Sequence, residues 1–164
     1  MRALTIPGVE VGAWTVRNGF DGAARALADR HYSRRKSKIG SNQVGGAGRR
    51  LVFVSPCERA LWVTRWPYAH LSNDSLDSWR CSYFRNEGAG LSSDLIVAAM
   101  ALTAEIWGDE PPDGWVTWVD PRKVASANPG YCFKRAGWWL DREWSHPHLL
   151  RFRAALSQSK GTDG

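Results

Sequence analysis

The feature that most constrains the fold is an alternation along the chain between apolar segments with strand character and segments with helical periodicity. Strands are expected over residues 12–17, 51–55, 60–66, 80–85, 115–119 and 138–144. Helices are expected over residues 21–31, 92–107 and 129–136. This order predicts an α/β fold in three layers (α/β/α), with helices on both faces of a central mixed sheet.

Length and turn residues indicate how these segments are organised. The 164 residues show no repeat and no linker, so residues 1–155 are expected to form a single domain, followed by a disordered tail over 156–164. Asp21 is placed to cap the first helix, and Gly137 the last one. Residues 33–50 are basic and rich in glycine, and they are expected to form a loop that buries no face.

Composition excludes several classes of protein. No apolar run reaches the roughly 18–20 residues that a membrane helix needs, and the first residues lack the apolar core of a secretory signal. Cys57, Cys81 and Cys132 are isolated, which argues against a disulfide framework and a structural zinc site. The expectation is a cytoplasmic protein (host cytoplasm if phage-encoded), with reduced thiols and no membrane partner.

The excess of positive over negative charge is confined to the first third of the chain. Residues 1–60 contain eleven Lys and Arg against four Asp and Glu, whereas residues 61–164 contain eleven against twelve. Clustered cations bind polyanions by neutralising phosphates and releasing counterions. The residues expected to bind nucleic acid are Arg34, Arg35, Lys36, Lys38, Arg49 and Arg50. The alternative is a solvated loop that keeps the protein soluble.

Ten tryptophans are an unusual number for a chain of this length. Most are expected to fill the core, while a few exposed rings would stack on unpaired bases. Trp66 and Trp79 flank a loop and are the better candidates for stacking, because Trp115 and Trp118 belong to a strand pattern.

The segment Arg85–Gly90 has the sequence RNEGAG and joins a predicted strand to the long predicted helix. Glycines at such a junction let the backbone approach an anion at the positive end of the helix. The pattern resembles the pyrophosphate loop of GNAT N-acetyltransferases, and implies that an acyl-CoA would contact Arg85, Gly88, Gly90, Ser92 and Ser93.

A second motif follows in residues 129–138, PGYCFKRAGW. It resembles the closing segment of the same acetyltransferases, with Phe133 at the aromatic position and Gly137-Trp138 as the glycine–aromatic pair. Together the two motifs cover the C-terminal half of the chain and imply a GNAT-like fold.

Five further residues resemble the phage Mom family in their order and spacing: His31, Tyr32, Arg85, Asp120 and Tyr131. Mom proteins have an acetyltransferase-like fold and modify adenine in double-stranded DNA, which protects phage genomes from restriction. The resemblance implies a catalytic site at these residues, carbamoylmethylation of the adenine N6 amine, and dependence on iron.

The same residues make a plausible site on chemical grounds. Asp120 ends a predicted buried strand, where an α/β sheet opens to ligands, and a carboxylate there ligates a metal or accepts a proton. His31 with Asp120 would form a two-residue nucleus for a metal ion, completed by Tyr32 or Tyr131. In the structural alternatives, Asp120 is a turn residue before Pro121 and His31 only ends a helix.

Two other functions remain open at this point. One is an acetyl-CoA-dependent N-acetyltransferase that acts on RNA, aminoacyl-tRNA or a small amine. The other is a nucleic-acid-binding accessory protein with an inactive pocket. The sequence also leaves open the group donor, the DNA recognition sequence and the oligomeric state, a homodimer included.

Overall fold

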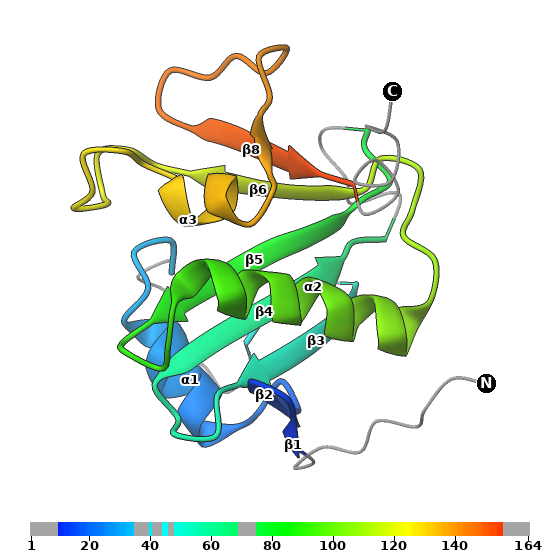
Figure 1. Cartoon of the computed structure of the whole chain (residues 1–164), viewed down its shortest axis with the longest axis vertical. Helices are drawn as coiled ribbons and strands as arrows, with labels where there is room; N and C mark the ends of the chain where they lie inside the picture. Colours follow the sequence, from blue (N-terminus) through cyan, green and yellow to red (C-terminus); the bar gives the residue numbers. More distant parts are fainter. Residues whose placement is uncertain (1–9, 35–39, 41–43, 46–47, 69–74, 156–164) are drawn as a thin grey trace.

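A computed structural model describes residues 10–34, 40, 44–45, 48–68 and 75–155 of the chain. Its centre is one mixed sheet of eight strands in the order β1-β2-β3-β4-β5-β6-β8-β7, accompanied by three helices (Figure 1). The predicted α/β class and the mixed central sheet are therefore confirmed.

The elements follow the predicted order closely. The strands are β1 (Glu10–Val11), β2 (Trp14–Arg17), β3 (Arg49–Val54), β4 (Ala60–Trp66), β5 (Trp79–Asn86), β6 (Trp115–Val119), β7 (Trp139–Leu140) and β8 (Leu150–Ala154). The helices are α1 (Gly22–Asp29), α2 (Ser92–Trp107) and α3 (Tyr131–Arg135). Asp21 caps α1 as expected, because its carboxylate accepts a hydrogen bond from the Ala24 N–H.

The strands β5 and β6 run parallel and are connected through α2, whereas the other neighbours are antiparallel. Their pairing covers only Trp79 with Trp115 and Arg80 with Val116. One step further on, the Thr117 hydroxyl donates a hydrogen bond to the Cys81 carbonyl at 3.0 Å. Beyond this point β5 and β6 no longer pair with each other, although each still pairs with its other neighbour, so the sheet is open between their carboxyl ends.

Helices pack against both faces of the sheet. The apolar side of α1, with Ala24, Leu27 and Ala28, packs on alternate residues of β3 and β4 such as Val52 and Val63. The intervening residues of these strands, such as Phe53 and Trp62, face α2 and α3 instead. We refer to the two sides below as the α1 face and the α2 face.

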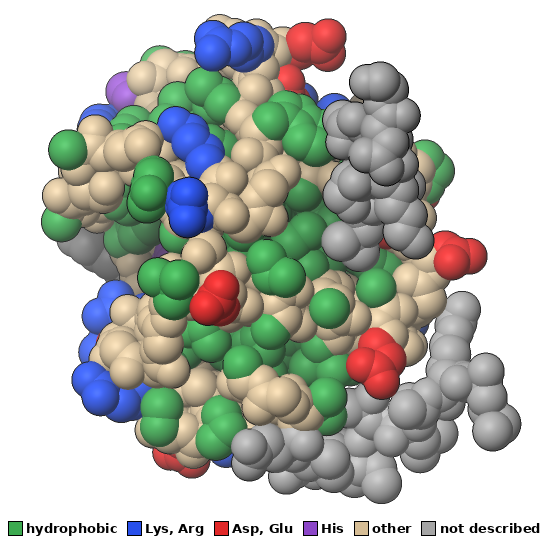
Figure 2. All heavy atoms as spheres, in the orientation of Figure 1, with side chains coloured by type: hydrophobic (Ala, Val, Ile, Leu, Met, Phe, Trp, Pro, Cys, Tyr) green, Lys and Arg blue, Asp and Glu red, His purple; other side chains and the backbone are tan. Residues whose placement is uncertain are grey.

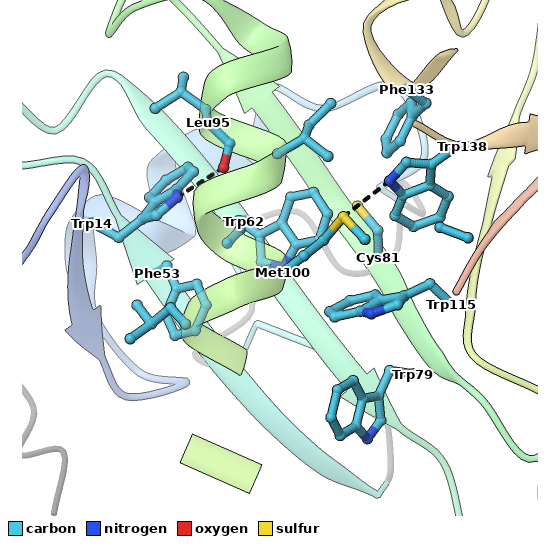
Figure 3. Close-up of a cluster of buried hydrophobic side chains, with 14 of the residues drawn as sticks. Trp14, Phe53, Trp62, Trp79, Cys81, Leu95, Met100, Trp115, Phe133 and Trp138 are labelled. Atoms are coloured by element: carbon cyan, nitrogen blue, oxygen red, sulfur yellow. Dashed lines mark hydrogen bonds between the residues drawn. The ribbon is translucent and has the colours of Figure 1, made fainter. Parts of the chain in front are cut away.

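The core on the α2 face is dominated by tryptophan (Figure 3). Several of the buried indole N–H groups donate hydrogen bonds, whereas those of Trp79 and Trp115 have no acceptor among the described residues. Trp14 donates to the Leu95 carbonyl at 3.0 Å, and Trp138 donates to the Met100 sulfur at 3.1 Å. The surface of this face has apolar side chains across its middle, and Lys and Arg side chains toward its left and upper parts (Figure 2).

The predicted last strand over residues 138–144 is wrong in its extent. Only Trp139 and Leu140 form β7, and the chain then turns back into β8, which the sequence pattern did not predict. The two arginines of β8 hid its strand character. Arg151 is neutralised by Asp141 at 2.6 Å, and Arg153 donates a hydrogen bond to the Asp113 carbonyl at 2.8 Å.

The basic segment also differs from its prediction as one continuous loop. Arg49 and Arg50 belong to β3, and Val44 is fully buried in the core of the α1 face, so the segment does bury an apolar residue. The candidates Arg35, Lys36 and Lys38, as well as the predicted tail 156–164, lie outside the described residues. Within the described ranges, no helix combines the length and hydropathy required to cross a membrane.

Candidate functional site

A cavity of about 750 Å³ lies where β5 and β6 separate. The walls come from both strands, from the residues after α1 and from the start of α3. The polar and aromatic side chains of this lining include His31, Tyr32, Arg34, Arg65, Arg80 and Trp118. A cavity of this size is within the usual range for small-molecule sites, and it lies at the sheet edge where α/β proteins bind ligands.

His31 lies in the cavity wall with both ring nitrogens engaged. Its Nε2 donates to the Phe84 carbonyl at 3.1 Å, and its Nδ1 accepts from the Ser33 N–H at 3.1 Å. Burial lowers the pKa of His31 to about 4, and the charge of Arg85 acts in the same direction. The imidazole is therefore neutral at neutral pH, and its contacts fix its orientation.

Tyr32 stacks on the His31 ring, with 4.6 Å between the ring centroids. The Tyr32 hydroxyl accepts a hydrogen bond from the Asp120 N–H at 3.4 Å, which connects the end of α1 to the end of β6. Burial raises the pKa of Tyr32. Tyr32 is therefore a neutral phenol, with a hydroxyl proton that it can donate within the cavity.

Asp120 follows β6 directly, as predicted, but its carboxylate is bound by a neighbour. Arg122 contacts both carboxylate oxygens through its guanidinium, at 3.1 and 3.0 Å. These hydrogen bonds lower the pKa of Asp120 to about 2, so the carboxylate is ionised at neutral pH. This pairing gives Asp120 a structural role at the turn after β6.

Arg85 belongs to a three-residue ion cluster beside the cavity. Glu87 accepts two hydrogen bonds from the Arg30 guanidinium, at 2.8 and 2.9 Å, and another from Arg85. Arg85 also donates to the Arg30 carbonyl at 2.8 Å. The hydrogen bonds from Arg30 and Arg85 lower the pKa of Glu87 to about 2. The cluster holds the end of α1 against the end of β5, directly after the wall residue Phe84.

The Gly88–Gly90 loop lies before α2, as the motif predicts, and both glycines have positive φ. The side chain of Asn86 already occupies some of the hydrogen-bonding groups of this loop. The Asn86 carbonyl oxygen accepts from the N–H groups of Gly88 and Ala89, at 3.1 and 2.9 Å, and its amide donates to the Ser92 hydroxyl at 2.9 Å. The Gly88 amide, which is among the residues expected to contact the cofactor, is thus already satisfied, as is the amide of Ala89. CoA binding at this loop, Ser93 included, stays a prediction.

Tyr131 begins α3, but its side chain is 53% exposed, and it is its neighbours Gly130 and Cys132 that line the cavity. Gly130 has a φ of +79° and packs directly on the Phe152 ring, so no larger residue fits there. The structure thus places His31 and Tyr32 in the cavity wall. It places Arg85, Asp120 and Tyr131 at its margin, each adjacent in sequence to a lining residue.

The described cations of the predicted nucleic-acid set occupy three different settings. The side chain of Arg34 is only 3% exposed, is paired with Asp29 at 3.1 Å and lines the cavity. Arg49 is exposed over the rings of Trp66 and Trp107, at 5.2 and 4.9 Å from their centroids. Arg50 is half-buried in β3 beneath Gly19 and Gly45.

The expected division among the tryptophans is wrong. Trp79 is completely buried and Trp66 packs against it at 6.0 Å, so both belong to the core. Trp118 is the tryptophan that lines the cavity. The continuous apolar run of β6 does not show which residues face which side of the sheet. Trp118 is on the α1 face, whereas its neighbours Thr117 and Val119 are on the α2 face.

Two arginines in the cavity wall were missed by sequence reasoning. Arg65 and Arg80 lie opposite each other on β4 and β5, and the Arg80 guanidinium lies over the Trp118 ring at 5.2 Å from its centroid. A charged residue at an inward-facing position of a predicted strand is the pattern that marks them. The cavity is therefore both aromatic and cationic.

The described residues do not fit an iron site built on His31 and Asp120. Nδ1 of His31 accepts from Ser33, and both oxygens of Asp120 accept from Arg122. Among the described ranges, no three His, Cys, Asp or Glu side chains gather closely enough to hold a metal ion. Iron stays a prediction from the Mom resemblance, and no step below depends on it.

We compared the chain with protein-family models, curated proteins and solved structures. None of them matches it. The resemblance to Mom and GNAT proteins thus depends on the residues and motifs described above.

Proposed function

We propose that this chain is a DNA base-modifying transferase of GNAT-like architecture that acts on the adenine N6 amine, as the resemblance to Mom proteins implies. The observation that carries the proposal is the cavity at the open end of β5 and β6, with aromatic and arginine walls. None of the described residues that line it is acidic. An uncharged base attached to an anionic backbone suits such a cavity.

The dimensions and walls of the cavity favour an extruded nucleotide. A base inside a duplex is reached by flipping it out of the stack, at a cost of a few kcal/mol, and aromatic walls compensate by stacking. Trp118 and Tyr32 supply such rings, from β6 and from the residues after α1. Cys81 and Cys132 add apolar surface, because burial raises the pKa of both thiols and keeps them uncharged.

Tyr32 is the residue best placed to assist the chemical step. Its ring stacks on the His31 ring, and its neutral hydroxyl accepts a hydrogen bond from the Asp120 N–H, so its position is fixed before substrate binds. In this proposal Tyr32 donates a hydrogen bond to the reacting group, and His31 acts as a positioning residue. With a pKa of about 4, His31 is a weak base at neutral pH.

The test is mass spectrometry of nucleosides from the DNA of cells that express the protein. Wild type and Tyr68→Phe, which alters an exposed tyrosine outside the cavity, should both yield a deoxyadenosine species of increased mass. Tyr32→Phe should lower its amount by about 10²-fold, the lower range for loss of one hydrogen bond to the reacting group in the transition state.

Unmodified DNA from cells that contain folded wild-type protein would contradict the proposal. If the purified protein instead acetylated RNA, aminoacyl-tRNA or a small amine with acetyl-CoA, the N-acetyltransferase alternative would replace it.

A further inference from the structure

A row of arginines crosses the α1 face of the sheet. Arg50 on β3 pairs with Arg65 on β4, and Arg65 pairs with Arg80 on β5. The row continues through Val116 on β6 to Arg153 on β8. Directly paired residues lie on the same side of a sheet, so four of these five strands present an arginine in register.

Such a row is unfavourable for the sheet alone, because like charges directly opposite each other repel. The central pair shows this effect, since burial and then the charge of Arg80 lower the pKa of Arg65. The two outer arginines lie farther from the cavity. Arg153 bonds to the Asp113 carbonyl, and Arg50 lies beneath Gly19 and Gly45.

The central pair opens into the cavity. Arg80 is 9% exposed, and its guanidinium carbon lies over the Trp118 ring at 5.2 Å from the ring centroid. Arg34 lines the same space and is oriented by Asp29. No acidic side chain is among the described residues of the lining. Three arginines thus converge on a water-accessible space in which none of the described lining residues is acidic.

We propose that Arg65 and Arg80 form an anion site that binds the phosphodiester of the nucleotide whose base enters the cavity. The planar guanidinium fork matches two oxygens of a phosphate, and the cation–π contact of Arg80 with Trp118 limits the movement of one fork in advance. The ligand class is a phosphate group, and its assignment to nucleic acid depends on the proposed function.

The first experiment measures binding of inorganic phosphate to the full chain by calorimetry, at constant ionic strength against chloride. Arg65→Gln should weaken the affinity about tenfold or more, as expected for loss of a charge-assisted hydrogen bond. Arg142→Gln, the same charge change at an exposed position outside the cavity, should leave the affinity within about twofold. A folded Arg65→Gln protein with wild-type affinity would overturn the site.

A second measurement uses wild-type protein and so does not depend on the folding of a variant. Modification by phenylglyoxal, read by peptide mass spectrometry, should be slowed at Arg65 and Arg80 by inorganic phosphate and unchanged at Arg142. Equal modification rates with and without phosphate would overturn the site.

The source of the phosphate is distinguished by two competitors in the same assay. A short single-stranded oligodeoxynucleotide containing adenine should protect Arg65 and Arg80, whereas CoA at equal phosphate concentration should not. Protection by CoA alone would overturn the assignment to nucleic acid. Phosphate binding without any DNA modification in cells would overturn the proposed function and leave the anion site standing, so the two failures are distinguishable.

Discussion

The two ends of the β5–β6 junction are built from the same strands and have opposite properties. At the end where they pair, Trp79 and Trp115 are fully buried and their rings lie 5.3 Å apart. At the end where they separate, Trp118 faces a cavity, and the guanidinium of the paired residue Arg80 lies over its ring. Trp115 lies on the α2 face among the paired residues, whereas Trp118 lies on the α1 face beyond the last pair. The face of β6 and the end of the pairing therefore together decide which ring packs in the core and which faces the cavity.

The difference extends to polar groups. Trp14 and Trp62, on β2 and β4, donate to Leu95 and Thr64 within the core, whereas the buried indole nitrogens of Trp79 and Trp115 at the paired end have no acceptor among the described residues. At the open end, cations line an accessible space, and Tyr32 and His31 are held by hydrogen bonds at its edge. The paired end is filled by packed rings, and the open end holds the cavity to which we assign the proposed chemistry.

The largest expected effect separates the two ends by stability. Trp79→Ala removes a fully buried ring and should lower the free energy of unfolding by about 3–5 kcal/mol. Trp118→Ala removes a half-buried ring at the cavity and should cost clearly less. Urea denaturation of the two variants checks this, and equal losses would remove the distinction between the two ends.

The next effect concerns pH and His31 at the open end. The unfolded chain binds a proton at His31 near pH 6.5, whereas the folded chain binds it only near pH 4. The free energy of unfolding therefore falls as the pH drops from 6.5 toward 4, by up to about 3 kcal/mol, and His31 causes no such loss above pH 6.5.

His31→Gln should remove this part of the pH dependence. Unfolding measured at intervals between pH 6.5 and 5 separates it from Glu87 and Asp120, whose carboxylates titrate at lower pH. A variant with the wild-type slope would contradict the buried, neutral histidine.

A third prediction sharpens the contrast between the cations of the basic segment and those of the cavity. Replacing Arg35, Lys36 and Lys38 by alanine should reduce the slope of log K against log salt for double-stranded DNA, by about 0.9 for each phosphate that the variant no longer neutralises. Arg34→Ala should instead lower stability, because that side chain is buried against Asp29. An unchanged slope in the triple variant would indicate that these cations only solubilise the chain.

The smallest expected effect is at the ion cluster beside the cavity. Glu87→Gln weakens the interactions with Arg30 and Arg85, and because these side chains are partly exposed the loss of stability should be at most about 1 kcal/mol. Thermal unfolding at low and high salt measures it. A loss of several kcal/mol would mean that the cluster is a major support of the open end.

Much of the fold could be predicted because local patterns agreed with it. The bounds of α2 and β6 coincide with the predicted 92–107 and 115–119, since long apolar periodicity and a continuous apolar run are strong patterns. β8 could not be predicted, because its arginines acquire their counter-charges from Asp141 and their hydrogen bonds from Asp113 only in the folded chain.

The site was less predictable than the fold. His31 and Tyr32 were identified from a short motif, and they do line the cavity. Arg65, Arg80 and Trp118 were missed, because their grouping depends on strand register and on where the parallel pairing stops. Neither feature can be read from local sequence.

The central claim is that an adenine nucleotide binds at the open end of β5 and β6. The most direct measurement is a crystal structure of the full chain with a short single-stranded oligodeoxynucleotide containing one adenine. We expect the adenine ring to lie in the cavity against Trp118, with its amine toward the Tyr32 hydroxyl. The phosphate of the same nucleotide should lie at Arg65 and Arg80. An oligonucleotide bound elsewhere on the surface, with the cavity free of any base, would contradict it.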